Sequence, residues 1–334
     1  MNTYRTAVIG CGRIGSLFSK DPLRKGIVTH AAAYKNNART RLVAACDTDK
    51  DRLKEFGNTW GVKSLYTDIK KMLAKEKIDI LRICTPPSSH YPVLKEAAKF
   101  PLKAIFCEKP IAASVAGGEK MVTLCKKNNI ILQIGHQRRF DPLHNNLRKF
   151  ITDRKMGEIQ QANFYYTAGV KNTGSHMFDI LRFFFGDAEW VEAFLSKNSS
   201  GRVEDPNLDG MLKFKNGLIS TFQACDVKKF LIYDLNCIFD EGRIVLTNSG
   251  FSLDFYRAGD SKYFSGYKEL FNAKSPFKTE YKRDSMVSAV RHLVECVDKK
   301  RESISSSLDG LSSLKIIEAA IDSAGRDGKR VYLK

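Results

Sequence analysis

A strand-like run, Thr6–Ile9, leads directly into a glycine-rich segment with the order Gly10-Cys11-Gly12-Arg13-Ile14-Gly15. A helix-compatible stretch, 13–20, follows it. A strand, a GxGxxG turn and a helix in this order form the fingerprint of a dinucleotide-binding βαβ unit. The first glycine permits the tight turn, the second lets backbone amides approach a pyrophosphate, and the third lets the helix pack closely on the strand. The chain therefore begins as a doubly wound α/β fold. The residues predicted to contact the dinucleotide here are Gly10, Gly12, Arg13 and Ile14.

An acidic residue, Asp47, follows the next predicted strand, 41–46. A carboxylate at this point bonds the ribose hydroxyls and repels a 2′-phosphate, which favours NAD over NADP. Asp47 lies 32 positions after Gly15, whereas about 20 separate the two in the usual unit. The polar segment 21–26 is predicted to hold the excess as a surface insertion. The alternative is that Asp47 caps the next helix, although Asp49 is equally suited to that role.

A second apolar run, 104–107, ends abruptly in Glu108-Lys109-Pro110. Ligands of an open α/β sheet bind beyond the carboxyl ends of its strands, and a charged pair is costly there unless something uses it. Pro110 restricts the turn, so the Lys109 ammonium is predicted to be aimed rather than mobile. We predict that Glu108 and Lys109 belong to the ligand-binding edge of the sheet. A solvated strand end is the alternative.

Strands and helices alternate up to residue 135, which is the pattern of a doubly wound parallel sheet. Beyond residue 136, longer segments with alternating apolar residues predict a mostly antiparallel sheet, and two helices are expected near the C-terminus. The segments are 160–168, 209–214, 217–224 and 232–239 for the strands, and 285–298 and 308–325 for the helices. We predict a dinucleotide-binding domain over 1–135 and a substrate-binding and oligomerisation α/β domain over 136–334. The C-terminal tail is a segment that can pack back on the first domain.

Length and composition agree with this organisation. A chain of 334 residues with 43% hydrophobic residues fits two domains with full cores. No apolar run approaches the ~20 residues of a membrane span, and residues 1–5 leave no room for a signal peptide. The eight cysteines show no CxxC pair and no metal-ligand spacing. Because Cys46, Cys84 and Cys107 lie in apolar strand runs, buried thiols in a reducing cytoplasm are predicted, with no metal site and no membrane partner.

The net charge of +18 raises the question of nucleic-acid binding. The basic residues are spread along the chain and mixed with acids, as in the segment 298–302. There is no sustained basic block and no aromatic signature of an RNA-binding module. We therefore predict a solvated basic surface that tolerates anionic sugar nucleotides, and no nucleic-acid partner.

A second candidate site lies at 172–176. Asn172 and His176 are four positions apart, so they share one face if this segment is helical. The strongly apolar stretch 177–185 would anchor such a helix against a core. A histidine that merely caps the helix is the alternative.

Together these features resemble the Gfo/Idh/MocA family of glucose-fructose oxidoreductases and inositol dehydrogenases. The resemblance covers essentially the whole chain. Its motifs are the segment 10–15, Asp47, Thr85-Pro86 with His90, Glu108-Lys109-Pro110, 138–140, 174–179, 309–311 and 328–331. It implies a Rossmann domain followed by an α/β domain whose open antiparallel sheet commonly forms the subunit interface. It also implies dinucleotide contacts from Thr85, Pro86, His90, Glu108, Lys109 and Gln137.

The family also assigns roles in the second site. The equivalent of His176 lies beside the nicotinamide in the family, and inositol dehydrogenase-like members carry Asp four residues before it. This chain has Asn172 there, and an amide cannot accept a proton as a carboxylate does, although it can hold a substrate hydroxyl. Pro87, where many relatives have Asn, is a second departure. Proton transfer is therefore expected to depend on Lys109 or His176.

The predicted activity is NAD-dependent hydride transfer to or from a secondary alcohol or ketone of a sugar, cyclitol or sugar-nucleotide derivative. Lys109 is predicted to hydrogen-bond the reacting oxygen, His176 to act as general acid/base and Asn172 to orient the hydroxyl. Two alternatives stay open: a glycosidase that uses transient oxidation, and a catalytically inactive dinucleotide-sensing regulator. A homodimer or homotetramer is predicted because the second sheet supplies more apolar surface than one helix layer covers. The residues behind this prediction are Leu212, Phe214, Ile219, Phe222, Leu231, Tyr233 and Leu235.

Overall fold

The computed structural model describes residues 2–277 and 284–333, which form two compact units. Unit 1 contains residues 2–141 and 284–314, and unit 2 contains residues 142–277 and 315–333. The predicted division after residue 135 lies just before the short 3-10 helix η2 (Gln137–Phe140). The segment that returns to unit 1 is 284–314, whereas the final residues belong to unit 2. Helix α9 (Ser307–Ala324) therefore contributes residues to both units.

Unit 1 is built on a six-stranded parallel sheet with the order β3-β2-β1-β4-β5-β6. This is the Rossmann order, in which the strand sequence reverses direction between β1 and β4. The strands are β1 (Tyr4–Ile9), β2 (Thr40–Cys46), β3 (Ser64–Tyr66), β4 (Ile80–Ile83), β5 (Ala104–Cys107) and β6 (Ile131–Ile134). The helices are α1 (His30–Lys35), α2 (Lys50–Trp60), α3 (Ile69–Lys75), α4 (Pro87–Ala97), α5 (Val115–Lys127) and α8 (Ser285–Lys299).

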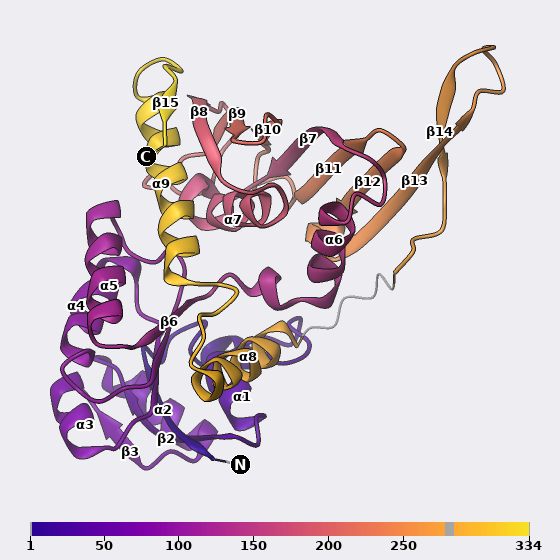
Figure 1. The fold of residues 1–334 in the computed structure, drawn as a ribbon. Coiled ribbons are helices and arrows are strands. Elements are labelled where there is room, and N and C mark those ends of the chain that lie inside the picture. The colour runs from indigo at the N-terminus through magenta and orange to yellow at the C-terminus, as the bar shows by residue number, and fades with distance from the viewer. Residues whose placement is uncertain (1, 278–283, 334) are drawn as a thin grey trace. The chain divides into compact units, whose positions relative to one another are not determined.

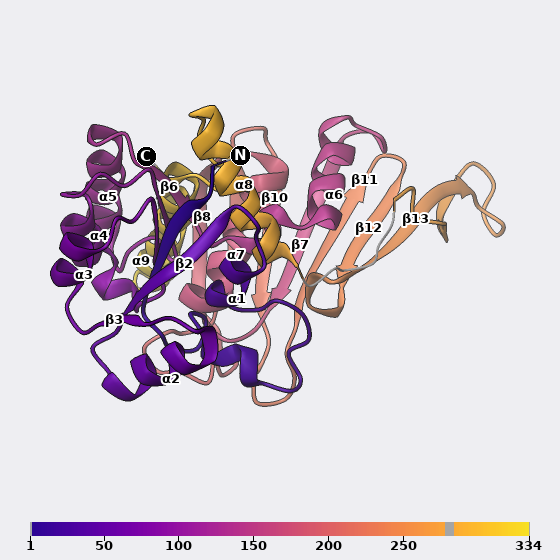
Figure 2. The ribbon, with the colours of Figure 1, turned by 90° about the horizontal axis from the view of Figure 1, so that it is seen from below.

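Both faces of this sheet are covered, which explains why its strands read as continuous apolar runs. Residues of α3, α4 and α5 pack on one face, for example Met72, Leu94 and Met121. Residues of α1, α2 and α8 pack on the other, for example Tyr34 and Leu293. Figure 2 shows the two helix layers of unit 1 on either side of its strands.

The expected helix over 13–20 is the main local prediction that was wrong. The chain instead makes a turn and a short 3-10 helix, η1 (Leu17–Lys20), and the regular helix α1 begins only at His30. The His30 N–H donates to the carbonyl of Ile14 at 3.1 Å, and the next amide donates to Gly15. In an uninterrupted helix, the N–H of residue 18 would donate to the Ile14 carbonyl. Here His30 takes that place, twelve residues later, so the chain makes a twelve-residue excursion (18–29) before the helix continues. The insertion is therefore longer than the predicted segment 21–26.

Unit 2 contains a nine-stranded sheet with the order β14-β13-β12-β11-β7-β10-β9-β8-β15 (Figure 1). Its pairs are antiparallel except for β7 with β10. The strands are β7 (Ile159–Tyr166), β8 (Ala188–Leu195), β9 (Leu208–Phe214), β10 (Ile219–Ala224), β11 (Tyr233–Phe239), β12 (Gly242–Thr247), β13 (Ser252–Asp260), β14 (Lys268–Asn272) and β15 (Val331–Tyr332). Beside the sheet lie α6 (Pro142–Thr152), the π-helical turn η3 (Gly169–Thr173), α7 (Gly174–Phe185) and the last part of α9, with the short η4 (Asn248–Gly250) after β12.

The core of unit 2 corrects one part of the assembly argument. The predicted uncovered apolar face includes Leu212, Phe214, Phe222, Tyr233 and Leu235. They are buried in one cluster with residues of α6, α7 and α9, because the helices cover more of the sheet than the sequence indicated. Of the predicted set, only Ile219 (43% exposed) and Leu231 (66% exposed) reach the surface.

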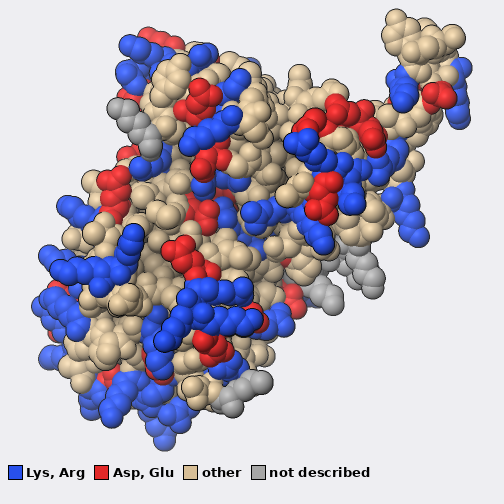
Figure 3. Space-filling view, viewed as in Figure 1, with Lys and Arg blue, Asp and Glu red and all other residues tan. Residues whose placement is uncertain are grey.

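The charged side chains are distributed as the composition suggested. Lys and Arg are spread over the visible face of each unit, with Asp and Glu among them (Figure 3). No helix in the described part of the chain combines the length and the apolar character that a membrane span requires. Within the same part of the chain, no cluster of three or more His, Cys, Asp or Glu residues is arranged to hold a metal ion.

Candidate active site

The glycine turn at the carboxyl end of β1 has the geometry that a bound dinucleotide requires. Gly10 has a φ of +91°, and a Cβ there would lie 2.8 Å from the backbone of Cys84 at the end of β4. A Cβ on Gly15 would lie 2.1 Å from the Gly10 carbonyl oxygen, so the chain packs directly on itself. A Cβ on Gly12, in contrast, would meet no atom within 4 Å. The side of the turn from which a pyrophosphate would approach is therefore open, and NAD fits this turn.

Asp47 lies beside this turn at the end of β2. One of its carboxylate oxygens accepts the Cys11 N–H at 2.7 Å, and the other accepts the Asp49 N–H at 2.9 Å. Helix α2 is capped by Asp49, whose side chain accepts from the amides of Asp51 and Arg52. The alternative role of Asp47 as the helix cap is therefore wrong. Its carboxylate is fixed next to the glycine turn, where a ribose contact is expected.

Arg13 lies on the exposed rim of the same turn. Its guanidinium carbon is 5.0 Å from the ring centroid of Phe18, and that of Arg24 is 3.9 Å from the same centroid. Phe18 and Arg24 both belong to the twelve-residue excursion. The cation–π contact between Arg13 and Phe18 therefore joins the excursion to the glycine turn. Lys20 of the excursion also pairs with Glu55 of α2. The insertion therefore lies against the elements that flank Asp47.

The Glu108-Lys109-Pro110 segment leaves the carboxyl end of β5, and its Lys109–Pro110 peptide bond is cis. Glu108 is buried at 8% exposure, and its carboxylate lies 2.5 Å from Nε2 of His30. Burial raises the pKa of Glu108, but His30 and Lys109 outweigh this effect and hold the pKa below its usual value. Glu108 is therefore a carboxylate near neutral pH, immediately before the half-buried Lys109.

The remaining predicted cofactor residues lie along the same edge of the sheet. Thr85 follows β4, and Pro86 occupies the N-cap position of α4. His90 is fully buried; its Nε2 is 2.8 Å from the Thr85 carbonyl and its Nδ1 is 3.0 Å from that of Pro110. Its side chain therefore joins the loop after β4 to the loop after β5. Gln137 begins η2 and is half-buried. Cofactor contacts from these residues stay predictions.

In unit 2, Asn172 lies in the π-helical turn η3 and His176 lies in the first turn of α7. Single π-helical turns are often found at functional sites. Nδ2 of Asn172 donates to the Ala168 carbonyl at 3.2 Å. The backbone carbonyl of Asn172 accepts from the Ser175 hydroxyl at 2.7 Å. The apolar residues of α7 that follow His176 are buried, as expected, so the helix is anchored in the core of unit 2.

Two residues that the sequence reasoning missed hold this turn. The Asp205 carboxylate accepts the amides of Lys171 at 2.7 Å and Asn172 at 2.9 Å. The Asn207 side chain accepts the Gly169 N–H at 2.9 Å. Asp205 and Asn207 are 5% and 2% exposed, respectively. In the sequence these two residues belong to an Asp-Pro-Asn segment before β9. That segment indicates a turn, but it does not indicate which part of the chain the two side chains contact.

The predicted catalytic residues thus divide between the two units. Lys109 lies in unit 1 with all of the predicted cofactor contacts, whereas Asn172 and His176 lie in unit 2. Within unit 1, the structure brings Gly10, Gly12, Asp47, Thr85 and Glu108 to the carboxyl edge of the parallel sheet. His30 was not identified from the sequence. It contacts Glu108 because α1 begins at His30, directly after the insertion.

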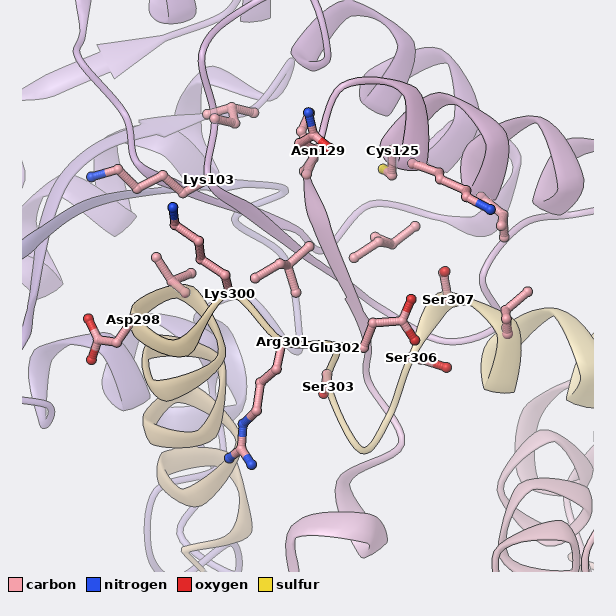
Figure 4. A pocket seen from close by; sticks show the side chains of 18 of the residues that line it. Lys103, Cys125, Asn129, Asp298, Lys300, Arg301, Glu302, Ser303, Ser306 and Ser307 are labelled. Carbon is pink, nitrogen blue, oxygen red and sulfur yellow. The ribbon is translucent and has the colours of Figure 1, made fainter.

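A cavity of about 960 Å³ lies at the amino ends of the parallel strands, where β5 and β6 begin (Figure 4). Lys103, Asn129, Lys300 and Arg301 are among its lining residues. Lys103 is already paired with Asp79 at 2.8 Å. Because dinucleotides bind at the carboxyl ends of parallel strands, this cavity is separate from the glycine turn.

Comparison with known proteins agrees with the geometry. Residues 4–136 match the family model described as an oxidoreductase family with an NAD-binding Rossmann fold, and residues 168–244 match the GFO/IDH/MocA C-terminal domain. D-apiose dehydrogenase of Paraburkholderia graminis is 26% identical over 99% of this chain and 90% of its own length. The NAD(+)-dependent scyllo-inositol 2-dehydrogenase of Bacillus subtilis is 24% identical over 98% and 96%.

The fold is shared with solved structures as well. The WlbA dehydrogenase from Bordetella pertussis, crystallised with NADH and UDP-GlcNAcA, superposes with a TM-score of 0.80 at 21% identity, covering 100% of this chain and 99% of that one. The two matching models, in the order Rossmann domain then C-terminal domain, cover most of the chain. The protein belongs to the Gfo/Idh/MocA family of oxidoreductases, with an NAD-binding Rossmann fold at its N-terminus.

Proposed function

We propose that this protein is an NAD-dependent dehydrogenase or reductase of a sugar, cyclitol or sugar-nucleotide derivative, acting on a secondary alcohol or the corresponding ketone. The observation that carries the proposal is the carboxyl edge of the parallel sheet of unit 1, where the open glycine turn, Asp47 and the Glu108–Lys109 segment follow β1, β2 and β5. Relatives named for D-apiose, scyllo-inositol and a UDP-sugar acid support the substrate class.

In this proposal, bound NAD supplies the hydride acceptor or donor, and the protein supplies position and proton handling. Lys109 hydrogen-bonds the reacting oxygen and stabilises the charge that develops on it. His176 exchanges the hydroxyl proton as general acid or base, because an imidazole titrates near the working pH. Asn172 holds the hydroxyl by hydrogen bonds without taking its proton. The proposal requires that Lys109 and His176 reach the same substrate molecule.

The cofactor preference follows from Asp47. The fixed carboxylate at the end of β2 would repel a 2′-phosphate, so NADH should bind more tightly than NADPH. Arg13 is the residue that works against this preference, since a guanidinium near the ribose attracts phosphate. Fluorescence titration of both reduced cofactors tests the assignment, and tighter binding of NADPH would overturn it.

The substrate class is tested by direct assay. Purified protein with NAD+ is offered D-apiose, scyllo-inositol, myo-inositol and UDP-GlcNAcA, and NADH is followed by absorbance. We expect one of these classes to give NADH well above the rate without substrate. Absence of NADH with all of them, in protein that binds NAD+, would contradict the proposed activity.

We further propose a homodimer or homotetramer built on the sheet of unit 2. Tyr165 in β7, Met211 in β9 and Ile219 in β10 lie on neighbouring strands and are 37–43% exposed. In each strand a directly neighbouring residue is buried, so these three side chains project from the outer face of the sheet, and exposed apolar residues on one sheet face are typical of an association surface. A monomer mass by light scattering at micromolar concentration would count against this assembly.

A cytoplasmic location completes the proposal. All eight cysteines are free, and Cys11, Cys46 and Cys107 are among the buried ones. Free buried thiols are typical of a reducing compartment. Fractionation of the source cells with an antibody against the protein tests the location, and recovery outside the cytoplasm would contradict it.

A further inference from the structure

A fully buried arginine lies in the parallel sheet of unit 1, close to the candidate active site. Arg82, in β4, has 0% exposure. Its guanidinium carbon lies 3.0 Å from the ring centroid of Phe106 in β5. One guanidinium nitrogen is 3.1 Å from Nε2 of His30 and 3.3 Å from the Met286 sulfur. Its Nε and Nη1 have no hydrogen-bond partner among the described residues. A buried cation of this kind is costly to the fold.

His30 links Arg82 to the Glu108 carboxylate. His30 is also fully buried, and its Nε2 lies 2.5 Å from a carboxylate oxygen of Glu108. Burial lowers the pKa of His30, but Cys84 and Glu108 outweigh this and raise the pKa to about 9. The Glu108 carboxylate therefore lies against the His30 imidazole, which together with Lys109 keeps it ionised, and Arg82 contacts the same imidazole nitrogen.

The other side of the Glu108 carboxylate contacts the segment that carries Lys109. The second carboxylate oxygen accepts the Lys109 backbone N–H at 3.3 Å. A Cβ on Gly135, after β6, would lie 2.9 Å from the first oxygen, so no larger residue fits beside the carboxylate. Glu108 is thus held between His30, the end of β6 and the Lys109 backbone.

We propose that Glu108 is a positioning residue, which fixes Lys109 while the buried His30, itself in contact with Arg82, holds the Glu108 carboxylate in one place. This inference rests on the proposed function, in which Lys109 contacts the reacting oxygen. The buried guanidinium of Arg82 contacts the histidine that holds this carboxylate. His30 is the residue at which helix α1 resumes, so the same network joins the insertion to the Lys109 turn.

The test compares a broken network with a neutral one. Glu108→Gln leaves the buried Arg82 guanidinium beside a histidine that has lost its carboxylate, and it is expected to lower stability. The double variant Arg82→Met/Glu108→Gln removes charges of both signs, lets His30 become neutral and should recover the stability. Thr6→Val is the matched control, since Thr6 is buried in β1 and its hydroxyl has no partner among the described residues.

Two readouts are measured in NAD+-saturated protein. The first is hydrogen exchange of the Lys109 backbone amide, which needs no substrate. We expect it to be at least about tenfold faster in both Glu108 variants, because a charge-assisted hydrogen bond is lost, and unchanged in Thr6→Val. The second is turnover of whichever of D-apiose, scyllo-inositol, myo-inositol or UDP-GlcNAcA the wild type oxidises. We expect a fall of about 10²-fold in both Glu108 variants.

A merely structural role predicts a different pattern. In that case the double variant, once its stability is recovered, regains turnover within a few-fold of wild type, and the proposal is overturned. It is also overturned if the Lys109 amide exchanges at the wild-type rate in Glu108→Gln. A deuterium isotope effect on turnover that rises in the double variant supports mispositioning, since the chemical step then limits the rate. If the wild type turns over none of these substrates, the proposed function fails, while the amide exchange still decides the positioning role.

Discussion

The two halves of the candidate site are held in different ways. In unit 1, the glycine turn is fixed by its own backbone and by the end of the adjacent strand β4, and the Lys109 turn adds the contact of Glu108 with His30. In unit 2, the turn that carries Asn172 is held by Asp205 and Asn207, more than thirty residues further along the chain. A cofactor site can therefore be formed by a local motif, whereas the substrate side depends on a long-range clamp.

The two halves also differ in the charges that support them. Glu108 is supported by the charged groups His30 and Lys109. Asp205 is instead supported by backbone amides. Burial raises the pKa of Asp205, and the amides of Lys171 and Asn172 oppose that rise. Substitutions in unit 1 are thus expected to act through charge, and those in unit 2 through the shape of the turn.

The largest effect is expected where each half meets the substrate. Lys109→Met and His176→Ala should each lower turnover by about 10² to 10⁴, the usual contribution of a general acid or base. NADH affinity should change far less, because the glycine turn and Asp47 hold the cofactor. Lys103→Met, at the opposite end of β5, is the control for removal of a lysine and should keep wild-type turnover. Turnover near wild type in both site variants would contradict the proposed roles of Lys109 and His176 in proton transfer.

A smaller effect tests the clamp of unit 2. Asp205→Asn keeps the shape but loses one of two acceptors for backbone N–H groups, and each lost buried hydrogen bond costs about 1–3 kcal/mol. We expect turnover to fall by about 10-fold or more while NADH affinity stays unchanged, since the cofactor contacts lie in unit 1. Asp209→Asn, whose carboxylate accepts the Ala224 amide at 2.6 Å, is the control. Equal losses in both variants would mean that Asp205 only stabilises the fold.

The glycine turn allows a paired test of stability against binding. Gly15→Ala forces a Cβ to within 2.1 Å of backbone and should destabilise unit 1 by several degrees in Tm. Gly12→Ala meets no protein atom within 4 Å, so Tm should stay within about 2 °C of wild type. Its NADH affinity should nevertheless fall by about tenfold, because the added methyl group lies where the pyrophosphate approaches. Unchanged NADH affinity in Gly12→Ala would place the dinucleotide elsewhere.

Asn172 stands where related inositol dehydrogenases have Asp, and its replacement is expected to have an effect of intermediate size on turnover. Asn172→Asp restores the carboxylate of related inositol dehydrogenases next to the Ala168 carbonyl that Asn172 now bonds. We expect a shifted pH profile of turnover, because a carboxylate stabilises the protonated form of a nearby imidazole. Complete loss of activity would show that the Asn172 amide has a more direct role than orientation.

The smallest effect is a pH dependence of stability from His30. Its pKa is raised from 6.5 to about 9, so its stabilising contribution is fully present below pH 6.5 and is lost as pH rises through about 9. The difference in Tm between wild type and His30→Gln should therefore shrink between pH 6.5 and pH 9. A difference that stays constant over this range would contradict a charged His30 in the folded protein.

Much of the fold was predictable because its signals are local. The strands β1, β2 and β5 of unit 1 and the strands β7, β9, β10 and β11 of unit 2 agree with the sequence patterns to within a few residues. The interrupted helix after Gly15 was predicted wrongly. A helix-compatible sequence cannot reveal that its hydrogen bonds are continued by His30 rather than by residue 18.

The supports of the site were not predictable for the same reason. Arg82 reads as an ordinary charge in a strand, and only the tertiary structure brings it to Phe106 and His30. Asp205 reads as a turn residue, and its contact with the π-helical turn spans more than thirty residues. The sequence therefore identified the groups proposed to do the chemistry, but not those that hold them.

The most direct test of the account follows the hydride itself. A sugar or cyclitol substrate that carries deuterium on the reacting carbon is incubated with the protein and NAD+, and the nicotinamide is examined by mass spectrometry. We predict that deuterium accumulates in the reduced nicotinamide in step with formation of the ketone. Deuterium that leaves and returns to the sugar without net NADH would indicate the glycosidase alternative. NAD+ bound tightly with no deuterium transfer from any substrate class would contradict the central claim that this protein is a dehydrogenase.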